Sequence, residues 1–394
     1  MSVLTFQVES LLEDAVRKEG VDDFHGSTGT GFLEPLGVLC AAYDAAPLSE
    51  VGRWILRAGL VHSLRMRLRV HEWVRRHPEV LDERVEDPVV VVGMMRSGTT
   101  LVQRLLAADP ALCAAAGWEV LEAAPPLDAD PADPAARIER GLAREAQTRE
   151  HAPELFAIHP MHALEAEEEI VFLADAFLSH VPESGAHVPG YRSWLDAQDL
   201  SPAYDHLHLV LQLLQWQKRL RGEPVGRWVL KTPAHLGYLD TLRARFPGLH
   251  LVHLHRDPLE TIPSGASLNT VLHRLHSDTV DPQRIGREWL ERMGWTHDRA
   301  LDTRERWARD ATAPRVTDIA FRSAVADPWP QVARVYDDLG TRLTDEAQTS
   351  MRTWLDRRPP DPRRPAYTAE DFGLTPAGIA ERFGRDNLFV STDM

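Results

Sequence analysis

The 394-residue chain has few cysteines and no long apolar run, and both absences restrict the class of protein. Its two cysteines, Cys40 and Cys113, are too few for a disulfide framework and do not have the spacing of a metal site. No run of about 18 apolar residues predicts a membrane span. The first twenty residues carry acidic side chains early and have the pattern of an amphipathic helix rather than of a signal peptide. We therefore expect a cytoplasmic protein without a membrane span.

The segment DPVVVVGMMRSGTTLVQ, residues 87–103, combines an apolar run, a glycine-bounded loop and an apolar-periodic stretch. The β-branched run Val89–Val92 predicts a strand that is buried on both faces of a parallel sheet. The stretch from Thr99 onward predicts a helix with its leucines turned inward, namely Leu101, Leu105 and Leu106. Gly93 and Gly98 allow a tight turn, so that backbone N–H groups and the helix N-terminus can converge on an anion.

This loop lacks the lysine that a nucleoside triphosphate site requires. It has the GxxxxG spacing of such a site, but Thr99 stands at the position of the lysine that reaches the β- and γ-phosphates. The absence argues against ATP or GTP. Arg96 supplies a cation within the loop, and Ser97, Thr99 and Thr100 supply hydroxyl groups. This set suits a compact terminal anion on a 5′-phosphate without a bridging metal ion.

Two further strands, predicted between residues 227 and 268, each end in a cation. Trp228–Leu230 is followed by Lys231, and His250–Leu254 is followed shortly by Arg256 and then by a helix that carries Ser264. Ligands of open parallel sheets bind outside the carboxyl ends of the strands. Arg96, Lys231 and Arg256 should therefore gather at one edge as an anion site.

These elements predict an α/β protein with a P-loop-type three-layer fold, in which helices flank a central parallel sheet, plus helical additions at both ends. Residues 1–85 form a helical lead-in, with a helix that Ser49 caps and that runs to Trp73. Residues 86–340 form the main domain, with a fourth strand at Val316–Ala320 and a helical insertion at about 120–222. Within the insertion, helices are predicted at Glu165–His180 and Ala203–Arg221. Residues 341–394 form a helical tail.

The order and spacing of these motifs resemble those of sulfotransferases that use 3′-phosphoadenosine 5′-phosphosulfate (PAPS), of the bacterial branch that is similar to tyrosylprotein sulfotransferases. The resemblance covers about residues 88–340 and returns at 367–374. It implies sulfuryl transfer from PAPS to a hydroxyl or amine of a small-molecule acceptor. It also implies that the RSGTT loop holds the 5′-phosphosulfate through Arg96, Ser97, Gly98, Thr99 and Thr100.

The same resemblance assigns the other end of the nucleotide and one catalytic residue. Arg256 and Ser264 match the residues that hold the 3′-phosphate, and Lys231 matches the catalytic lysine of the K-x-P segment. Two features differ from the family pattern. Met94 and Met95 precede the loop arginine, where a small residue is usual, and the glycine-rich carboxyl-terminal clasp of the cytosolic animal members has no match. Four arginines of the tail either close over the nucleotide or form a solvated loop, namely Arg357, Arg358, Arg363 and Arg364.

Sulfuryl transfer needs a positively charged group beside the leaving oxygen, where negative charge develops, and a base that takes the proton of the acceptor. Lys231 and Arg96 can supply the charge. Glu119 is the favoured base, because similar members place a catalytic glutamate in this neighbourhood. His235, four residues after Lys231, is the rival, since histidine is the commoner general base near neutral pH. Its alternative role is a histidine that packs or caps a helix.

Acidic residues dominate residues 119–170, where 13 of them stand against 4 arginines in a chain of net charge −15. We expect the acceptor side to form there, unless these charges belong only to a solvated helix face. A wall of this sign repels polyanions, so nucleic acids and glycosaminoglycans are not expected, and a neutral or cationic small molecule is favoured. A homo-oligomer is compatible with the sequence.

Other interpretations remain open at this point. His253 and His255, or His206 and His208, could suggest a metal site, but no acidic or cysteine spacing accompanies them, so no metal is expected. An atypical phosphotransferase would need a carboxylate at a strand end to hold Mg²⁺. A non-catalytic nucleotide binder would share the loop and Arg256 but would not need Lys231 or Glu119.

Overall fold

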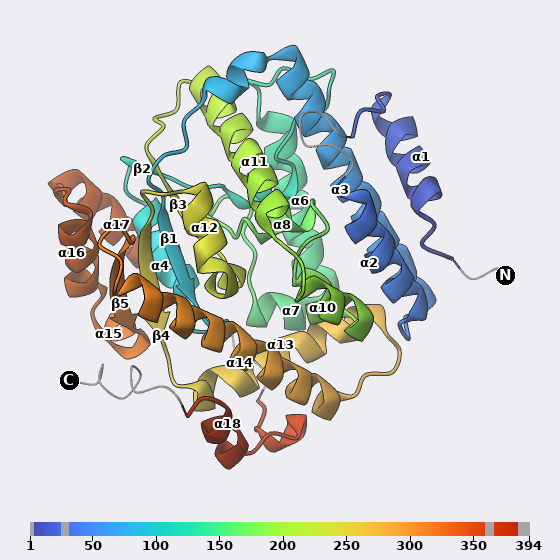
Figure 1. Ribbon diagram of the computed structural model, residues 1–394. Helices are drawn as coiled ribbons and strands as arrows, with labels where there is room; N and C mark the ends of the chain where they lie inside the picture. Colours follow the sequence, from blue (N-terminus) through green and yellow to red (C-terminus); the bar gives the residue numbers. More distant parts are fainter. Residues whose placement is uncertain (1–3, 25–30, 359–365, 385–394) are drawn as a thin grey trace.

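A central sheet of five parallel strands organises the molecule (Figure 1). The computed structural model describes residues 4–24, 31–358 and 366–384. The strand order is β2-β3-β1-β4-β5, so the strand that precedes the glycine loop lies in the middle of the sheet. The strands are β1 (Val89–Gly93), β2 (Leu112–Cys113), β3 (Arg227–Lys231), β4 (His250–His255) and β5 (Arg315–Ala320).

Strand β1 is fully buried because both of its neighbours and both sheet faces are covered. Val90 pairs with Leu230 of β3 on one side and with Leu251 of β4 on the other. All five residues of β1 are buried, as the uninterrupted β-branched run predicts. The four predicted strands are confirmed, with each bound differing by at most one residue. The two-residue strand β2 was not predicted, because a segment this short has no periodic signal.

Alternate residues of the strands face two separate helical layers. Val89 and Val91 pack in one apolar cluster with α4 (Thr99–Ala107), α16 (Pro328–Leu339) and α17 (Asp345–Arg357). Val90 and Val92 belong to a second and larger cluster with α11 (Ser201–Leu220), α12 (Leu239–Arg245) and α14 (Pro282–Trp307). Figure 1 shows the sheet between these layers. The predicted three-layer α/β architecture is confirmed.

The N-terminal helices share the larger apolar cluster with the sheet. They are α1 (Val8–Glu19), α2 (Leu33–Ala45) and α3 (Glu50–Arg76), and Leu11, Leu36 and Leu64 in them are fully buried. Ser49 caps α3 as predicted, since its Oγ accepts a hydrogen bond of 2.9 Å from the N–H of Gly52. Residues from Phe6 to Phe383 contribute to this one cluster. The division of the chain into three regions stays a prediction.

The segment between β2 and β3 is helical but more broken than the sequence predicts. The predicted helix at 203–221 is present as α11, whereas only residues 170–174 of the predicted helix at 165–180 are helical. Residues 165–169 are not helical there, because Ala166 forms an isolated antiparallel bridge with Ala116. The N–H of Glu167 donates to the carbonyl of Ala115 at 2.9 Å. A short helix, α8 (Ile170–Ala174), begins only after this bridge.

The remaining elements complete the two helical layers and the tail. They are η1 (Pro78–Asp82), α5 (Gly117–Leu121), α6 (Ala135–His151), α7 (Pro153–Ile158), α9 (Val181–Gly185), α10 (Pro189–Leu195), η2 (Pro233–Tyr238), α13 (Pro258–His276), α15 (Phe321–Ala326), η3 (Glu370–Phe372) and α18 (Pro376–Arg382). Within the described residues, no helix combines the length and the apolar character that crossing a membrane requires.

Candidate active site

The glycine loop between β1 and α4 requires its glycines for steric reasons. Gly93 and Gly98 have positive φ angles of 156° and 89°, and Arg96 also has a positive φ, of 76°. A Cβ atom on Gly93 would lie 2.5 Å from the Oγ of Ser97, and one on Gly98 would lie 2.7 Å from the ring of Phe321. The loop therefore winds tightly and delivers its backbone N–H groups and the N-terminus of α4 to one place.

Two of the predicted cations meet at this loop. Arg256 donates from Nη1 to the carbonyl oxygen of Arg96 at 2.8 Å. The Nε of Arg96 donates to the Oγ of Ser264 at 3.2 Å. The guanidinium of Arg256 stacks on Phe321, 4.1 Å from the ring centroid, and its Nε donates to Glu260 at 2.8 Å. The expected approach of Arg96, Arg256 and Ser264 at the strand ends is therefore present in the structure.

Lys231, the third cation, lies fully buried at the end of β3. Its Nζ donates to the carboxylate of Glu168 and, at 3.2 Å, to the Oγ1 of Thr100 in the loop helix. Burial opposes ionisation of Glu168, but the positive charges of Lys231 and His159 outweigh burial and hold the pKa of Glu168 below its ordinary value. A carboxylate with a lowered pKa thus contacts Lys231 beside the glycine loop.

The insertion closes over the loop at the end of α7. The Nη1 of Arg96 donates to the carbonyl oxygen of Ile158 at 2.9 Å, which brings the next residue, His159, over the site. Burial lowers the pKa of His159, although the nearby Glu168 and Glu167 raise it. Burial outweighs the two carboxylates, so the net shift of the His159 pKa is downward.

A cavity of about 350 Å³ lies against Arg96, Arg256, His159 and Glu168, whereas Lys231 and Ser264 do not line it. Its size is that of a small-molecule site, and it has cations at one end and an apolar wall from α15, α16 and α17 at the other. Arg358 of the tail lines it, whereas Arg363 and Arg364 lie outside the described residues. The lining residues are Met95, Arg96, Gly98, Thr99, Thr100, Leu101, His159, Glu168, Pro233, Arg256, Phe321, Ala324, Val325, Pro328, Leu355 and Arg358.

The structure does not place Glu119 in this cavity. Its side chain has no exposed surface, and its two carboxylate oxygens accept from Lys218 at 2.8 Å and from Arg221 at 3.0 Å. It also accepts from the N–H of Ala116 at the start of α5. An acceptor cannot reach a carboxylate that is enclosed and neutralised in this way. We therefore withdraw Glu119 as the general base.

His235 does not line the cavity either. It is fully buried in η2, its Nε2 lies 2.8 Å from the Oε1 of Glu169, and its Nδ1 lies 2.9 Å from the hydroxyl of Tyr204. Both ring nitrogens are thus engaged within the protein. This arrangement corresponds to the alternative role of a packed histidine, not to a base that contacts an acceptor.

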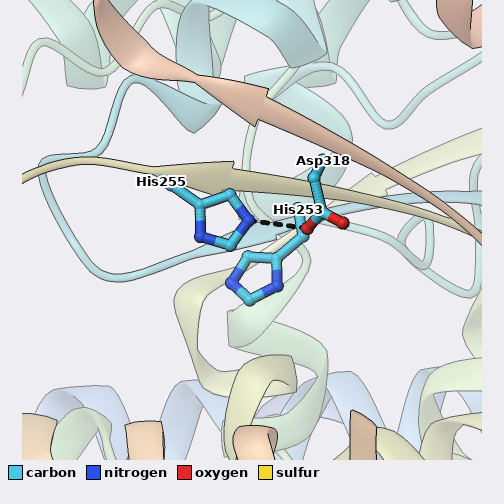
Figure 2. Close-up of side chains that lie close together, drawn as sticks. All are labelled: His253, His255 and Asp318. Atoms are coloured by element: carbon cyan, nitrogen blue, oxygen red, sulfur yellow. Dashed lines mark hydrogen bonds and ion pairs between the residues drawn. The ribbon is translucent and has the colours of Figure 1, made fainter. Parts of the chain in front are cut away.

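Among the residues that the structure describes, two groups of side chains have the ligand geometry of a metal site, and both already contact cationic side chains. His253, His255 and Asp318 form the first, shown in Figure 2, where the Nε2 of His255 lies 2.6 Å from Asp318. Arg304 donates to both oxygens of Asp318, at 2.7 and 2.8 Å, and lies 3.0 Å from the Nδ1 of His253. A metal ion there would have to displace a bidentate guanidinium.

The second group, His159, Glu167 and Glu168, lies at the cavity. Arg104 pairs with Glu167 and Lys231 pairs with Glu168, so basic side chains balance both carboxylates. Neither group gives a reason to route chemistry through a metal ion. The expectation of a metal-independent protein stays a prediction.

Sequence reasoning missed Glu168, His159 and Phe321. The signal for Glu168 was the run of three consecutive glutamates at 167–169, which is unusual before an apolar helix. The predicted helix obscured it, since a helix would have placed these carboxylates on different faces. Phe321 directly follows β5 and so lies at the same sheet edge as the cations, a position that the strand prediction implied.

A glycine loop at the central strand, cations at neighbouring strand ends and a carboxylate paired with one of them define a P-loop-like α/β protein with a candidate site for an anionic ligand. The model of the Sulfotransferase family matches residues 88–345, and the chain belongs to the sulfotransferase family. The match covers the sheet, the loop and the whole insertion.

Solved structures of mycobacterial sulfotransferases resemble nearly the whole chain. Sulfotransferase STF1 of Mycobacterium tuberculosis H37Rv is 30% identical, with a TM-score of 0.82, over 96% of this chain and 99% of that one. Sulfotransferase STF9 of Mycobacterium avium is 26% identical, with a TM-score of 0.85, over 98% and 96% of the two chains. The helical additions at both ends are therefore part of the shared architecture.

A curated relative resembles a shorter part. The omega-hydroxy-beta-dihydromenaquinone-9 sulfotransferase Stf3, from Mycobacterium bovis and from Mycobacterium tuberculosis, is 24% identical over 268 residues. This match covers 65% of this chain and 63% of the relative, so the chain spans less than two thirds of the relative's length.

Proposed function

We propose that this protein is an enzyme that transfers a sulfuryl group from PAPS to a hydroxyl or amine of a small-molecule acceptor. The observation that carries the proposal is the contact of Lys231 with Glu168 and Thr100 at the cavity beside the glycine loop. The ammonium of Lys231, which can stabilise a leaving oxygen, and the carboxylate of Glu168, which can accept a proton, are in direct contact. A protein that only binds a nucleotide has no need of this pair.

The residues at the cavity fit this donor. The RSGTT loop, Arg96 to Thr100, would hold the 5′-phosphosulfate, and Arg256 with Ser264 would hold the 3′-phosphate. The steric demand at Gly98 supports a cradle that leaves backbone N–H groups accessible to an anion. The aromatic ring of Phe321, already stacked on Arg256, offers an apolar surface for the nucleoside. When bound, PAPS supplies the sulfuryl group and leaves as adenosine 3′,5′-bisphosphate.

Glu168 takes the role of general base in this proposal. The acceptor oxygen or nitrogen forms its bond to sulfur, while its proton moves to the Glu168 carboxylate. Lys231 places its ammonium on the bridging oxygen, where negative charge grows as the old sulfur–oxygen bond breaks. The contact between Lys231 and Glu168 keeps the cation and the base next to each other, and the other oxygen of the Glu168 carboxylate takes the proton.

The acceptor is proposed to be a small molecule that is neutral at its reacting end. The name of the relative from Mycobacterium describes a sulfotransferase that acts on a hydroxylated menaquinone, which supports a hydroxyl acceptor here. Glu168 lines the cavity, and a negatively charged acceptor would meet its carboxylate unfavourably. No metal ion is proposed, and a location in the cytoplasm and a homo-oligomeric state stay predictions.

Transfer of labelled sulfate from PAPS to compounds of a cell extract tests the activity directly. We expect a product with a mass gain of one sulfuryl group and stoichiometric adenosine 3′,5′-bisphosphate. Tight binding of ATP with phosphate transfer would instead indicate a phosphotransferase. Nucleotide binding without any transfer would indicate a non-catalytic binder.

The donor assignment has its own test at Arg256. Replacing Arg256 with Ala should weaken the binding of adenosine 3′,5′-bisphosphate by about 2 kcal/mol, as expected for loss of a charged hydrogen-bond partner. Calorimetric titration with adenosine 5′-phosphate, which lacks the 3′-phosphate, is the control and should change much less. Equal weakening of both ligands would contradict the assignment of Arg256 to the 3′-phosphate.

A further inference from the structure

A chain of buried hydrogen bonds runs from helix α11 to the end of strand β3. It passes from Tyr204 to His235, then to Glu169, and ends at the backbone N–H of Lys231. The donor–acceptor distances of these three hydrogen bonds are 2.9, 2.8 and 3.0 Å. All four residues are at most 1% exposed. The hydrogen bonds thereby connect helix α11, η2, the residue before α8 and strand β3 within the apolar core.

The chemistry of the groups fixes the direction of this chain. Burial raises the pKa of Tyr204 far above its ordinary value, so its hydroxyl keeps its proton and donates to the Nδ1 of His235. His235 then carries its proton on Nε2 and donates it to Glu169. The other oxygen of Glu169 accepts from Lys231 N–H. Each buried polar atom along the line has a partner, as a low-dielectric interior requires.

The position of Glu169 in the sequence links this chain to the reacting groups. Glu169 follows Glu168 directly, and Glu168 contacts the ammonium of Lys231. The backbone of Lys231 is meanwhile held by Glu169. Glu168 therefore binds the side-chain ammonium of Lys231, and the adjacent Glu169 binds its backbone N–H. The separation between the Glu168 carboxylate and the Lys231 ammonium depends on where Glu169 is held.

We propose that Tyr204, His235 and Glu169 are positioning residues that set the Glu168–Lys231 contact. The inference rests on the proposed function, because it gives these residues a role in that reaction. None of them touches the acceptor or the donor. Their effect is transmitted through the backbone at 168–169 and at Lys231, so that loosening the chain separates the catalytic carboxylate from its cation.

Tyr204→Phe is the sharpest test, because it removes one hydroxyl and leaves the packing of the ring. Tyr191→Phe is the matched control, since Tyr191 is equally buried and its hydroxyl donates to the Phe177 carbonyl at 2.8 Å, away from the cavity lining. We expect Tyr204→Phe to lower kcat about tenfold, with the affinity for adenosine 3′,5′-bisphosphate changed less than twofold. Tyr191→Phe should lose stability but keep its turnover.

The acidic limb of the pH profile gives a readout that a merely structural role would not move. Lys231, His159 and Arg104 face Glu168 and favour its ionised form, whereas the Glu167 carboxylate, which has an oxygen within 4.8 Å of one of Glu168, opposes it. If the Lys231 contact loosens, the pKa of Glu168 rises, and the acidic limb of kcat moves to higher pH in Tyr204→Phe but not in Tyr191→Phe. His235→Gln, which keeps an N–H donor for Glu169, should restore part of the turnover lost in His235→Ala.

A measurement without turnover separates this inference from the proposed function. In protein labelled with ¹³C at glutamate carboxyl groups, the Glu168 signal is assigned by its loss in Glu168→Gln. It should titrate at higher pH in Tyr204→Phe than in Tyr191→Phe. This shift in a protein that transfers no sulfate would support the positioning chain and contradict the proposed function. Identical titration and kinetics in the two tyrosine variants would overturn the positioning role.

Discussion

Glu168 and Glu169 are adjacent in the sequence, yet their carboxylates have opposite surroundings. Glu168 lines the cavity and contacts the ammonium of Lys231, whereas Glu169 is enclosed between His235 and a backbone N–H. Glu119, which the sequence favoured as base, is enclosed by Lys218 and Arg221. The three carboxylates therefore differ in the one property a general base needs, which is access to the acceptor.

The first prediction compares Glu168 with Glu119. Glu168→Gln keeps the shape of the side chain and removes its basicity, so turnover should fall roughly a hundredfold to ten-thousandfold, the range of general base catalysis. Affinity for adenosine 3′,5′-bisphosphate should stay within a few-fold. Steady-state kinetics and calorimetry measure the two quantities.

Glu119→Gln is the control for this prediction. It leaves Lys218 and Arg221 without their buried carboxylate, so the free energy of unfolding should fall by about 3 kcal/mol, as when one partner of a buried ion pair is removed. The molecules of this variant that remain folded should have the kcat of the wild type. A folded but inactive Glu119→Gln together with an active Glu168→Gln would show that the base is Glu119 after all.

At the scale of elements, the glycine loop is the point where a single methyl group should matter most. Gly98 has a φ of 89°, and an added Cβ would meet the ring of Phe321 at 2.7 Å. Gly98→Ala should therefore cost about 1–3 kcal/mol of stability through backbone strain, and it should weaken nucleotide binding as the loop deforms. Urea unfolding and calorimetric titration measure both effects.

Gly59→Ala is the matched control for the loop substitution. Gly59 lies within helix α3 with nothing within 4 Å of an added Cβ. Alanine has the higher helix propensity, so this variant should gain about 0.5–1 kcal/mol and bind nucleotide as the wild type does. Equal behaviour of the two variants would show that the loop conformation at Gly98 is not required.

The elements that the sequence predicts well are those whose signal is local. Strand β1 follows from four consecutive valines, and helix α3 follows from the cap at Ser49 and the leucine spacing. The meeting of Arg96 with Arg256 also follows, because parallel strands present their carboxyl ends at one edge.

What escaped prediction depends on partners that are distant in the chain. Glu119 forms an ion pair with Lys218, which is 99 residues away in the sequence, and Lys231 forms one with Glu168, which is 63 residues away. No local pattern at residues 165–169 shows that distant basic side chains will hold the carboxylates in a non-helical segment. Periodicity therefore predicted a helix there, but the backbone bridge between Ala166 and Ala116 and the contacts of the carboxylates with other elements favour a non-helical conformation.

At the scale of the whole molecule, a buried acid should make stability depend on pH. Asp175, at the end of α8, is 3% exposed, and burial raises its pKa to about 7 although Ser63 and Arg67 oppose this. The folded protein keeps this proton up to about pH 7, while the unfolded chain releases it near pH 4. The free energy of unfolding should therefore fall as pH rises between these values.

Asp175→Asn removes this dependence. The gain in stability of the variant over the wild type should be larger at pH 8 than at pH 4, by on the order of 2–4 kcal/mol. Chemical unfolding at the two pH values measures it. A difference that does not change with pH would contradict the assignment.

Asp318→Asn is the control of opposite sign. Burial raises the pKa of Asp318, but Arg304 and His255 outweigh burial and depress it strongly. The stabilisation from this carboxylate is present above the unfolded pKa near 4 and is lost as pH falls below it. Asp318→Asn should therefore cost about 2 kcal/mol at pH 7 and less at lower pH.

The cap of helix α3 also joins it to the far end of helix α13. The N–H of Ser49 donates to the carbonyl oxygen of His276 at 2.9 Å, and an added Cβ on Gly52 would lie 1.9 Å from the same oxygen. These partners are 227 residues apart. During synthesis, the helix that forms first has to wait until more than half of the chain has left the ribosome before this contact can form. The N-terminal helices thus emerge early and complete their packing late.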